Sequence, residues 1–100
     1  MIPNEFTLSL NPPSQCNPMT TVRFDLPVGT RMTLRVYDAL GRQVTTLVDG
    51  IVAAGSHEAY LNSDGLSSGV YFFRMEAGTF IRTGKMLLLK QFSDHDHPMG

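Results

Sequence analysis

The fold is decided by the run Leu66-Ser67-Ser68-Gly69-Val70-Tyr71-Phe72-Phe73-Arg74, which a short hairpin separates from Lys85-Met86-Leu87-Leu88-Leu89-Lys90. Successive side chains of a β-strand point to opposite faces, so Tyr71 and Phe73 share one face while Phe72 lies on the other. Because both faces carry large apolar side chains, the first run predicts a central strand. Gly78 supplies the positive φ that a two-residue hairpin loop requires, and residues 80–89 then return as the last strand.

Upstream of this pair, apolar residues recur with a period of two, and Gly, Pro, Asn or Asp interrupts the pattern about every ten residues. The alternation predicts strands over residues 6–10, 20–26, 32–37, 44–48 and 56–61, and no segment has the period of a helix. Seven short strands with short connections predict two antiparallel sheets packed face to face, which is an all-β sandwich of the immunoglobulin or fibronectin kind. The expected core includes Phe24, Leu34, Val36, Leu47, Tyr71, Phe73 and Met86.

Polar turns connect the expected strands. In Asp38-Ala39-Leu40-Gly41-Arg42, the aspartate can accept hydrogen bonds from local backbone N–H groups, and Gly41 can adopt a positive φ. We expect Asp49-Gly50 and Ala54-Gly55 to bracket the next loop. A second polar turn is expected over residues 62–65, which end at Gly65, and Leu66 follows as an apolar plug under the edge of the sandwich.

Two segments fall outside the strand pattern. Residues 11–18 hold three prolines, which donate no backbone hydrogen bond, so we expect a loop that joins no sheet. Residues 91–100 have little apolar content, so we expect a flexible tail after a single sandwich domain over residues 1–90.

Composition limits the possible functions. Eight basic and nine acidic side chains leave a formal net charge of −1, so no long-range field attracts nucleic acid or an anionic membrane. Cys16 is the single cysteine, which excludes a disulfide within the chain and a thiolate cluster for zinc. No segment approaches the ~20 apolar residues of a spanning helix, and the amino terminus lacks the basic flank and apolar run of a signal peptide.

No arrangement of acids, bases, nucleophiles or metal ligands predicts catalysis. The sequence has no Gly-x-Ser-x-Gly elbow, phosphate loop or dinucleotide fingerprint, and its aspartates mostly fall in or beside turns. His57 stands alone in its strand, which favours a packed or rim position. Asp94, His95, Asp96 and His97 could hold a divalent ion only at the entropic cost of ordering a flexible segment, and calcium at turn aspartates stays open. We therefore expect no enzyme activity and no cofactor.

An alternative is a binding module. Arg23 and Arg35 fall on the outward faces of strands that are consecutive in the sequence. With Thr33 and Tyr37 they could form a shallow polar patch for carbohydrate or for an acidic partner. A solvated sheet surface explains the same residues.

Four fragments, in their order and spacing, give the chain a family resemblance. They are Thr20-Thr21-Val22-Arg23-Phe24-Asp25-Leu26-Pro27, then Val36-Tyr37-Asp38 with Gly41-Arg42, then Leu66 with Ser68-Gly69-Val70-Tyr71 and Arg74, and finally Lys85-Met86 through Lys90. Asn11-Pro12 and Asn17-Pro18 stand where the family has an Asn-Pro-rich opening. Over residues 6–90 the chain resembles the type A C-terminal sorting domain of the type IX secretion system, a family that overlaps with the immunoglobulin-like domain of flagellar hook-capping proteins.

The resemblance implies a non-catalytic domain at the end of a larger secreted protein. Such a domain transits the periplasm and directs its attached cargo across the outer membrane, for release or for surface anchoring. Its implied partners are the outer-membrane secretion machinery, a sortase-like peptidase and the covalently attached cargo. By resemblance, the sorting motif consists of Gly69, Tyr71, Arg74, Lys85, Met86, Leu87, Leu88, Leu89 and Lys90.

In one respect the sequence departs from the family. Ten residues follow Lys90, whereas family members usually end within a residue or two of that lysine. We also expect an upstream part of a larger chain to direct passage across the inner membrane. The alternative function is an adhesion or spacer module, a β-sandwich that binds carbohydrate or protein and is appended to a secreted enzyme.

Overall fold

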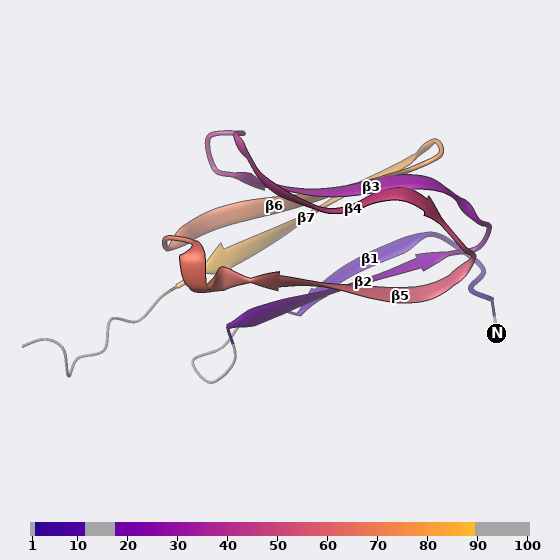
Figure 1. Ribbon diagram of the computed structural model, residues 1–100, viewed down its shortest axis with the longest axis horizontal. Helices are drawn as coiled ribbons and strands as arrows, with labels where there is room; N and C mark the ends of the chain where they lie inside the picture. The colour runs from indigo at the N-terminus through magenta and orange to yellow at the C-terminus, as the bar shows by residue number, and fades with distance from the viewer. Residues whose placement is uncertain (1, 12–17, 90–100) are drawn as a thin grey trace, which may run out of the picture.

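The structure is a computed structural model, and it describes residues 2–11 and 18–89. These residues form two antiparallel sheets packed face to face (Figure 1). The first sheet has the order β1-β2-β5, with β1 at Thr7–Asn11, β2 at Met19–Leu26 and β5 at Gly55–Asn62. The second has the order β4-β3-β6-β7, with β3 at Thr30–Asp38, β4 at Gln43–Val52, β6 at Gly69–Ala77 and β7 at Phe80–Leu88. The predicted all-β sandwich is confirmed.

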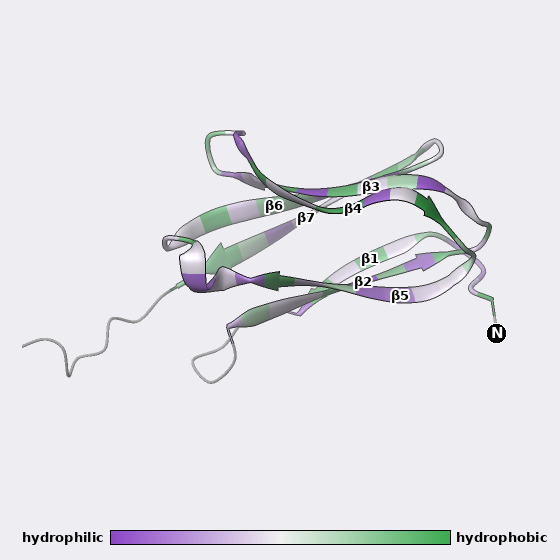
Figure 2. Cartoon of the chain, in the orientation of Figure 1, coloured by the Kyte–Doolittle hydropathy of each residue, from purple (hydrophilic) through white to green (hydrophobic). Residues whose placement is uncertain are grey.

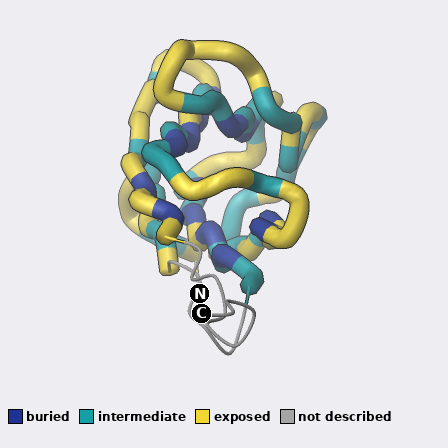
Figure 3. Tube along the Cα trace, turned by 90° about the vertical axis from the view of Figure 1, so that its left-hand side faces the viewer, coloured by how far each residue is buried: buried dark blue, intermediate teal, exposed yellow. Residues whose placement is uncertain are grey.

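The core lies between the sheets, because each strand turns alternate side chains inward. Hydrophobic and hydrophilic residues alternate along the strands (Figure 2), and in the view along the long axis the buried positions gather inside the exposed loops (Figure 3). The buried apolar residues are Val22, Phe24, Leu26, Met32, Leu34, Val36, Leu61, Tyr71, Phe73, Met75, Ala77, Met86 and Leu88. They include every predicted core residue except Leu47, which is only partly buried. Leu47 lies on the edge strand β4 at a bulge, because Leu34 pairs with Val48 and Arg35 pairs with Thr46, which leaves Leu47 without a register partner on β3.

One predicted loop is wrong. Asp49-Gly50 does not turn the chain but continues β4, because Asp49 pairs with Thr33 and Gly50 pairs with Met32. The connection to β5 therefore shrinks to residues 53 and 54. The polar turn over residues 62–65 contains a single turn of 3-10 helix, η1 at Ser63–Gly65, which the sequence pattern does not predict.

No helix of the described residues is long and apolar enough to cross a membrane.

The β6–β7 hairpin forms as the sequence predicts. β6 lies between β3 and β7, so it is the central strand that its two apolar faces indicate. The hairpin turns at Gly78-Thr79, and Gly78 has a φ of +59°, which a residue without a Cβ adopts at little cost. β7 ends the sheet as an edge strand.

The two ends of the sandwich hold different parts of the chain. At the proximal end, where the chain enters, the ring of Phe6 stacks on that of Phe80 with centroids 5.0 Å apart. At the distal end lie the turn after Asp38, the residues before Gly69, and Leu88. β7 runs from the proximal to the distal end (Figure 1). The loop expected within residues 11–18 and the tail expected over residues 91–100 fall almost wholly outside the described residues.

Candidate functional site

The β6–β7 hairpin brings the third and fourth of the quoted fragments side by side. The register pairs are Gly69 with Leu88, Val70 with Leu87, Tyr71 with Met86, and Phe72 with Lys85. Residues from separate parts of the sequence therefore form one two-stranded surface. Arg74 lies further along β6, opposite Thr83, so it is set back from the distal end and forms an ion pair with Glu76.

The terminal fragment has a buried half and an exposed half. Met86 and Leu88 are buried and form part of the core. Leu87 and Leu89 are 58% and 72% exposed, and Lys85 is exposed beside them. Since the buried half holds β7 in the fold, the exposed half is available to contact another molecule. The lysine that follows Leu89 lies outside the described residues.

A buried hydrogen bond ties β7 to the opposite sheet. The Oγ1 of Thr20 donates to the Sδ of Met86 over 3.1 Å, and both side chains are buried. The sequence pattern does not identify Met86 as the partner, although Thr20 shares the inward face of its strand with Val22 and Phe24. A hydroxyl at an inward position needs a buried partner, so that alternation was the signal for it.

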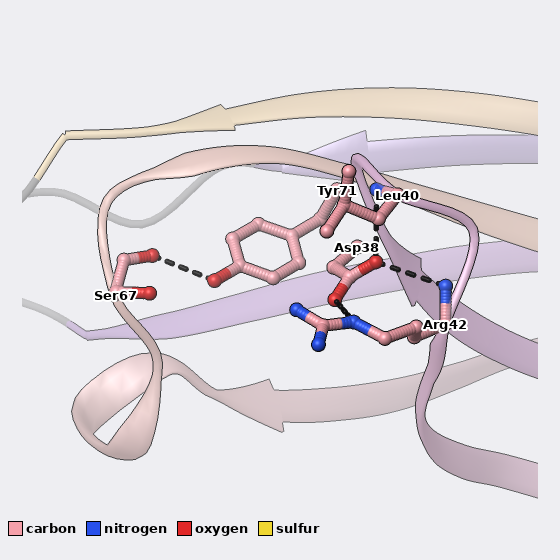
Figure 4. Close-up of polar contacts among 5 residues, drawn as sticks. All are labelled: Asp38, Leu40, Arg42, Ser67 and Tyr71. Atoms are coloured by element: carbon pink, nitrogen blue, oxygen red, sulfur yellow. Dashed lines mark hydrogen bonds and ion pairs between the residues drawn. The ribbon is translucent and has the colours of Figure 1, made fainter.

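Asp38 organises the turn between β3 and β4 (Figure 4). Its Oδ1 accepts hydrogen bonds from the backbone N–H groups of Leu40 and Arg42, both over 2.9 Å, and its Oδ2 accepts from Nε of Arg42 over 2.9 Å. Gly41, with a φ of +84°, donates its N–H to the Asp38 carbonyl oxygen. The backbone N–H of Arg42 is the main cause that lowers the pKa of Asp38, and the Arg42 guanidinium and the Leu40 N–H act in the same direction. The turn is therefore built around a charged carboxylate.

Tyr71 fixes the connection that leads into β6. Its hydroxyl donates to the carbonyl oxygen of Ser67 over 2.6 Å, and its ring is buried. Tyr71 is also the register partner of Asp38, so the two connections are anchored at neighbouring positions (Figure 4). Leu66 packs against the core, and Gly65 is the last residue of η1. Fragments that are far apart in the sequence thus build the distal end together.

The polar patch expected from Arg23, Arg35, Thr33 and Tyr37 does not form. Arg23 lies on β2 of the three-stranded sheet, whereas β3 of the four-stranded sheet carries the other three side chains. The chain crosses from one sheet to the other between β2 and β3, so the sandwich separates these residues. Arg23 instead forms an ion pair with Glu58 over 2.9 Å.

His57 is held by structural contacts. Its ring stacks on Phe24 with centroids 5.4 Å apart, and its Nε2 lies 2.8 Å from the carbonyl oxygen of Ala53. Within residues 2–11 and 18–89, no three His, Cys, Asp or Glu side chains gather as a metal site would require. His95 and His97 lie outside the described residues.

Comparison with known proteins places the quoted fragments in one family. A family model described as the secretion system C-terminal sorting domain matches residues 13–89. The matched part contains β2 to β7, so it includes the four fragments except the final lysine, whereas Asn11-Pro12 precedes it. No curated protein matches the chain with the significance expected of a relative.

Proposed function

Because the chain belongs to the family of secretion system C-terminal sorting domains, we propose that it directs an attached cargo protein across the outer membrane, for release or for surface anchoring. Domains of this family are C-terminal signals for type IX secretion, and they mark proteins that are exported to the cell surface or the medium. A sorting domain is a non-catalytic kind of domain. We therefore assign to the distal end the binding of the secretion machinery, and no catalytic step.

The exposed half of the terminal fragment is the observation that carries this proposal. Leu87 and Leu89 place large apolar side chains in solvent at the end of β7, next to the cation of Lys85. Adjacent apolar and cationic side chains on one short stretch are the kind of surface that a protein partner covers. We infer that the secretion machinery contacts these three residues and Lys90. Of the other motif residues, Gly69, Tyr71, Met86 and Leu88 then hold this surface in place, whereas Arg74 lies further along β6.

The shape of the sandwich separates the cargo from the signal. Cargo would precede Phe6, whose ring stacks on Phe80 at the start of β7. The nine residues of β7 span about 27 Å at the rise of an antiparallel strand. The machinery can therefore bind the distal end while the cargo extends from the proximal end.

We further propose that residues 1–90 are the sorting unit and that residues 91–100 are a tail that follows it. A sortase-like peptidase would cleave before β1, where Ile2, Asn4 and Glu5 are exposed. Cleavage there would release the cargo and leave both sheets intact, because it cuts no strand.

Export of a reporter protein tests the proposed function. The host is a bacterium with a type IX secretion system, and the reporter follows a signal peptide. One fusion carries residues 1–90 at its carboxyl end, a second carries residues 1–100, and a third carries neither. We expect the first fusion to reach the cell surface or the medium and the third to stay in the periplasm. If the signal is recognised at a free chain end, the ten-residue tail lowers export of the second fusion.

The opposite result would favour a different function. If neither domain fusion leaves the periplasm while both resist protease as folded proteins do, sorting is wrong for this chain. An adhesion or spacer module would then be the better account. Glycan binding by the purified domain would support that account.

A further inference from the structure

β7 offers a regular open edge. It has one hydrogen-bonded neighbour among the described strands, β6, and the two pair without a bulge from Ala77 with Phe80 to Gly69 with Leu88. β4, at the opposite edge of the same sheet, shifts its register along β3 at two places. Such irregularities discourage the addition of another strand, whereas a straight edge permits it. β7 is therefore the edge of the four-stranded sheet that a further strand can extend.

The register fixes which backbone groups this edge presents. Residues of an antiparallel pair alternate between hydrogen-bonded and non-hydrogen-bonded positions, and Ala77 and Phe80 close the two-residue hairpin as a bonded pair. Every second residue of β7 after Phe80 therefore bonds to β6. The residues between them turn their N–H and C=O groups toward the open edge, and these residues are Ile81, Thr83, Lys85 and Leu87.

The same edge is positively charged. In the described part of the chain, ion pairs join Arg23, Arg31, Arg42 and Arg74 to carboxylates. Arg82 and Lys85 of β7 have no carboxylate partner within this part of the chain, and both are exposed. The guanidinium carbon of Arg82 lies 5.6 Å from the centroid of the Phe80 ring. A cationic edge repels a second copy of itself and attracts an acidic strand.

Near Gly84, β1 restricts the side from which a partner strand can approach this edge. It packs against the inner side of β7, where a Cβ added at Gly84 would lie 3.1 Å from Cδ1 of Leu10. On the outer side, Thr83, Lys85 and Leu87 are exposed. At Gly84 a partner would therefore reach the edge from the outer face of the four-stranded sheet, whereas Arg82 on the inner side is exposed.

We propose that an extended acidic segment of the outer-membrane secretion machinery binds β7 as an additional strand of this sheet. The inference rests on the proposed function and specifies how the signal is recognised. The added strand would form backbone hydrogen bonds with the four edge-facing residues. One of its carboxylates would face Lys85, another would face Arg82 on the opposite side of the strand, and apolar side chains would cover Ile81 and Leu87, which are 54% and 58% exposed.

Thr83→Pro tests the backbone contact. Proline at this position removes an edge-facing N–H and obstructs strand addition, but it breaks no hydrogen bond to β6. Thr83→Ala is the matched variant, because it shortens the same side chain and keeps the N–H. In the reporter fusion that carries residues 1–90, we expect the proline variant to be exported about tenfold less than the alanine variant. Equal export of the two variants, with both domains folded by thermal unfolding, would overturn the inference.

A charge reversal provides a second test that decides the matter if Thr83→Pro does not fold. Arg82→Glu with Lys85→Glu reverses both edge cations. Arg23→Glu with Arg31→Glu changes the net charge equally at exposed positions on other strands. We expect the first pair to lower export about tenfold relative to the second pair. Equal export of the two double variants would overturn the acidic partner, whereas retention of the unmodified fusion in the periplasm would contradict the proposed function itself.

Discussion

Asp38 and Tyr71 are register partners across β3 and β6, and each anchors one connection at the distal end of the sandwich. Asp38 accepts hydrogen bonds from two backbone N–H groups of its turn, and Tyr71 donates to the connection before β6. The end of β7 pairs with the start of β6 beside them. The fragments that mark the family therefore meet next to the exposed half of the terminal fragment, and the stability of this end can be tested apart from its recognition.

Replacing Tyr71 by Phe should lower the free energy of unfolding by about 1 kcal/mol, because it removes the hydrogen bond to Ser67 and keeps the buried ring. Tyr37→Phe is the control, since the Tyr37 hydroxyl makes no hydrogen bond within the described residues, and it should change stability by less than about 0.5 kcal/mol. Urea unfolding of the purified domain measures both variants. A Tyr71→Phe domain as stable as its Tyr37→Phe counterpart would show that the bond to Ser67 adds nothing.

The turn at Gly41 depends on its backbone conformation. Gly41→Ala forces an L side chain to adopt a φ of +84°, which should cost about 1–2 kcal/mol. Gly65→Ala is the matched control, because a Cβ would meet nothing within 4 Å at either glycine and Gly65 has no positive φ. Differential scanning calorimetry should show a lower Tm for the Gly41 variant alone. Equal Tm values would mean that the turn does not strain an alanine.

Acid should weaken the Asp38 turn. The pKa of this carboxyl is lower in the folded state than in the unfolded state, so its contribution to stability is complete above the ordinary aspartate pKa of about 3.9 and disappears as the pH falls through the lowered value. Asp38→Asn keeps the acceptor oxygen and removes the charge. We expect the stability advantage of the natural residue over asparagine, measured by urea unfolding, to be present at neutral pH and to shrink below the ordinary pKa. An advantage that persists unchanged into strong acid would contradict this assignment.

Phe72 and Phe73 are neighbours on β6 and face opposite sides of the sheet. Phe73 is fully buried, so Phe73→Ala should cost roughly 3–5 kcal/mol through lost burial and a cavity. Phe72 lies on the outer face of the same strand and is only partly buried, so Phe72→Ala should cost much less. Chemical denaturation of both variants checks the difference. Similar losses at the two positions would contradict the assignment of the inner face.

The strands were predictable because alternation is a local property of the sequence. Val22, Phe24 and Leu26 repeat every second residue, and all three are buried as that pattern indicates. The pairing of strands was harder to predict. Asp49-Gly50 has the composition of a turn, yet its pairing with β3 keeps it extended, so tertiary contacts override the local preference.

The arrangement of the site could be predicted only in part. The resemblance identifies the fragments. Local sequence does not show which sheet a strand joins, so the outward alternation of Arg23 and Arg35 suggests a shared polar patch, whereas the two side chains lie on different sheets. The register pair of Asp38 and Tyr71 joins residues far apart in the chain, and neither alternation nor turn composition predicts it. Alternation places the Thr20 hydroxyl inside the sandwich and so indicates a buried partner, but it does not identify Met86 as that partner.

The central claim is that the secretion machinery binds the exposed half of the terminal fragment. Its most direct test compares two triple variants of the fusion that carries residues 1–90. Lys85→Ser, Leu87→Ser and Leu89→Ser together remove the exposed half of the terminal fragment and leave its buried half in place. Arg31→Ser, Leu40→Ser and Ile51→Ser remove a matched set of exposed side chains elsewhere. The measurement is the fraction of reporter outside the periplasm. The account predicts that the first variant stays in the periplasm as a folded protein while the second reaches the cell surface or the medium, and equal export of both would contradict it.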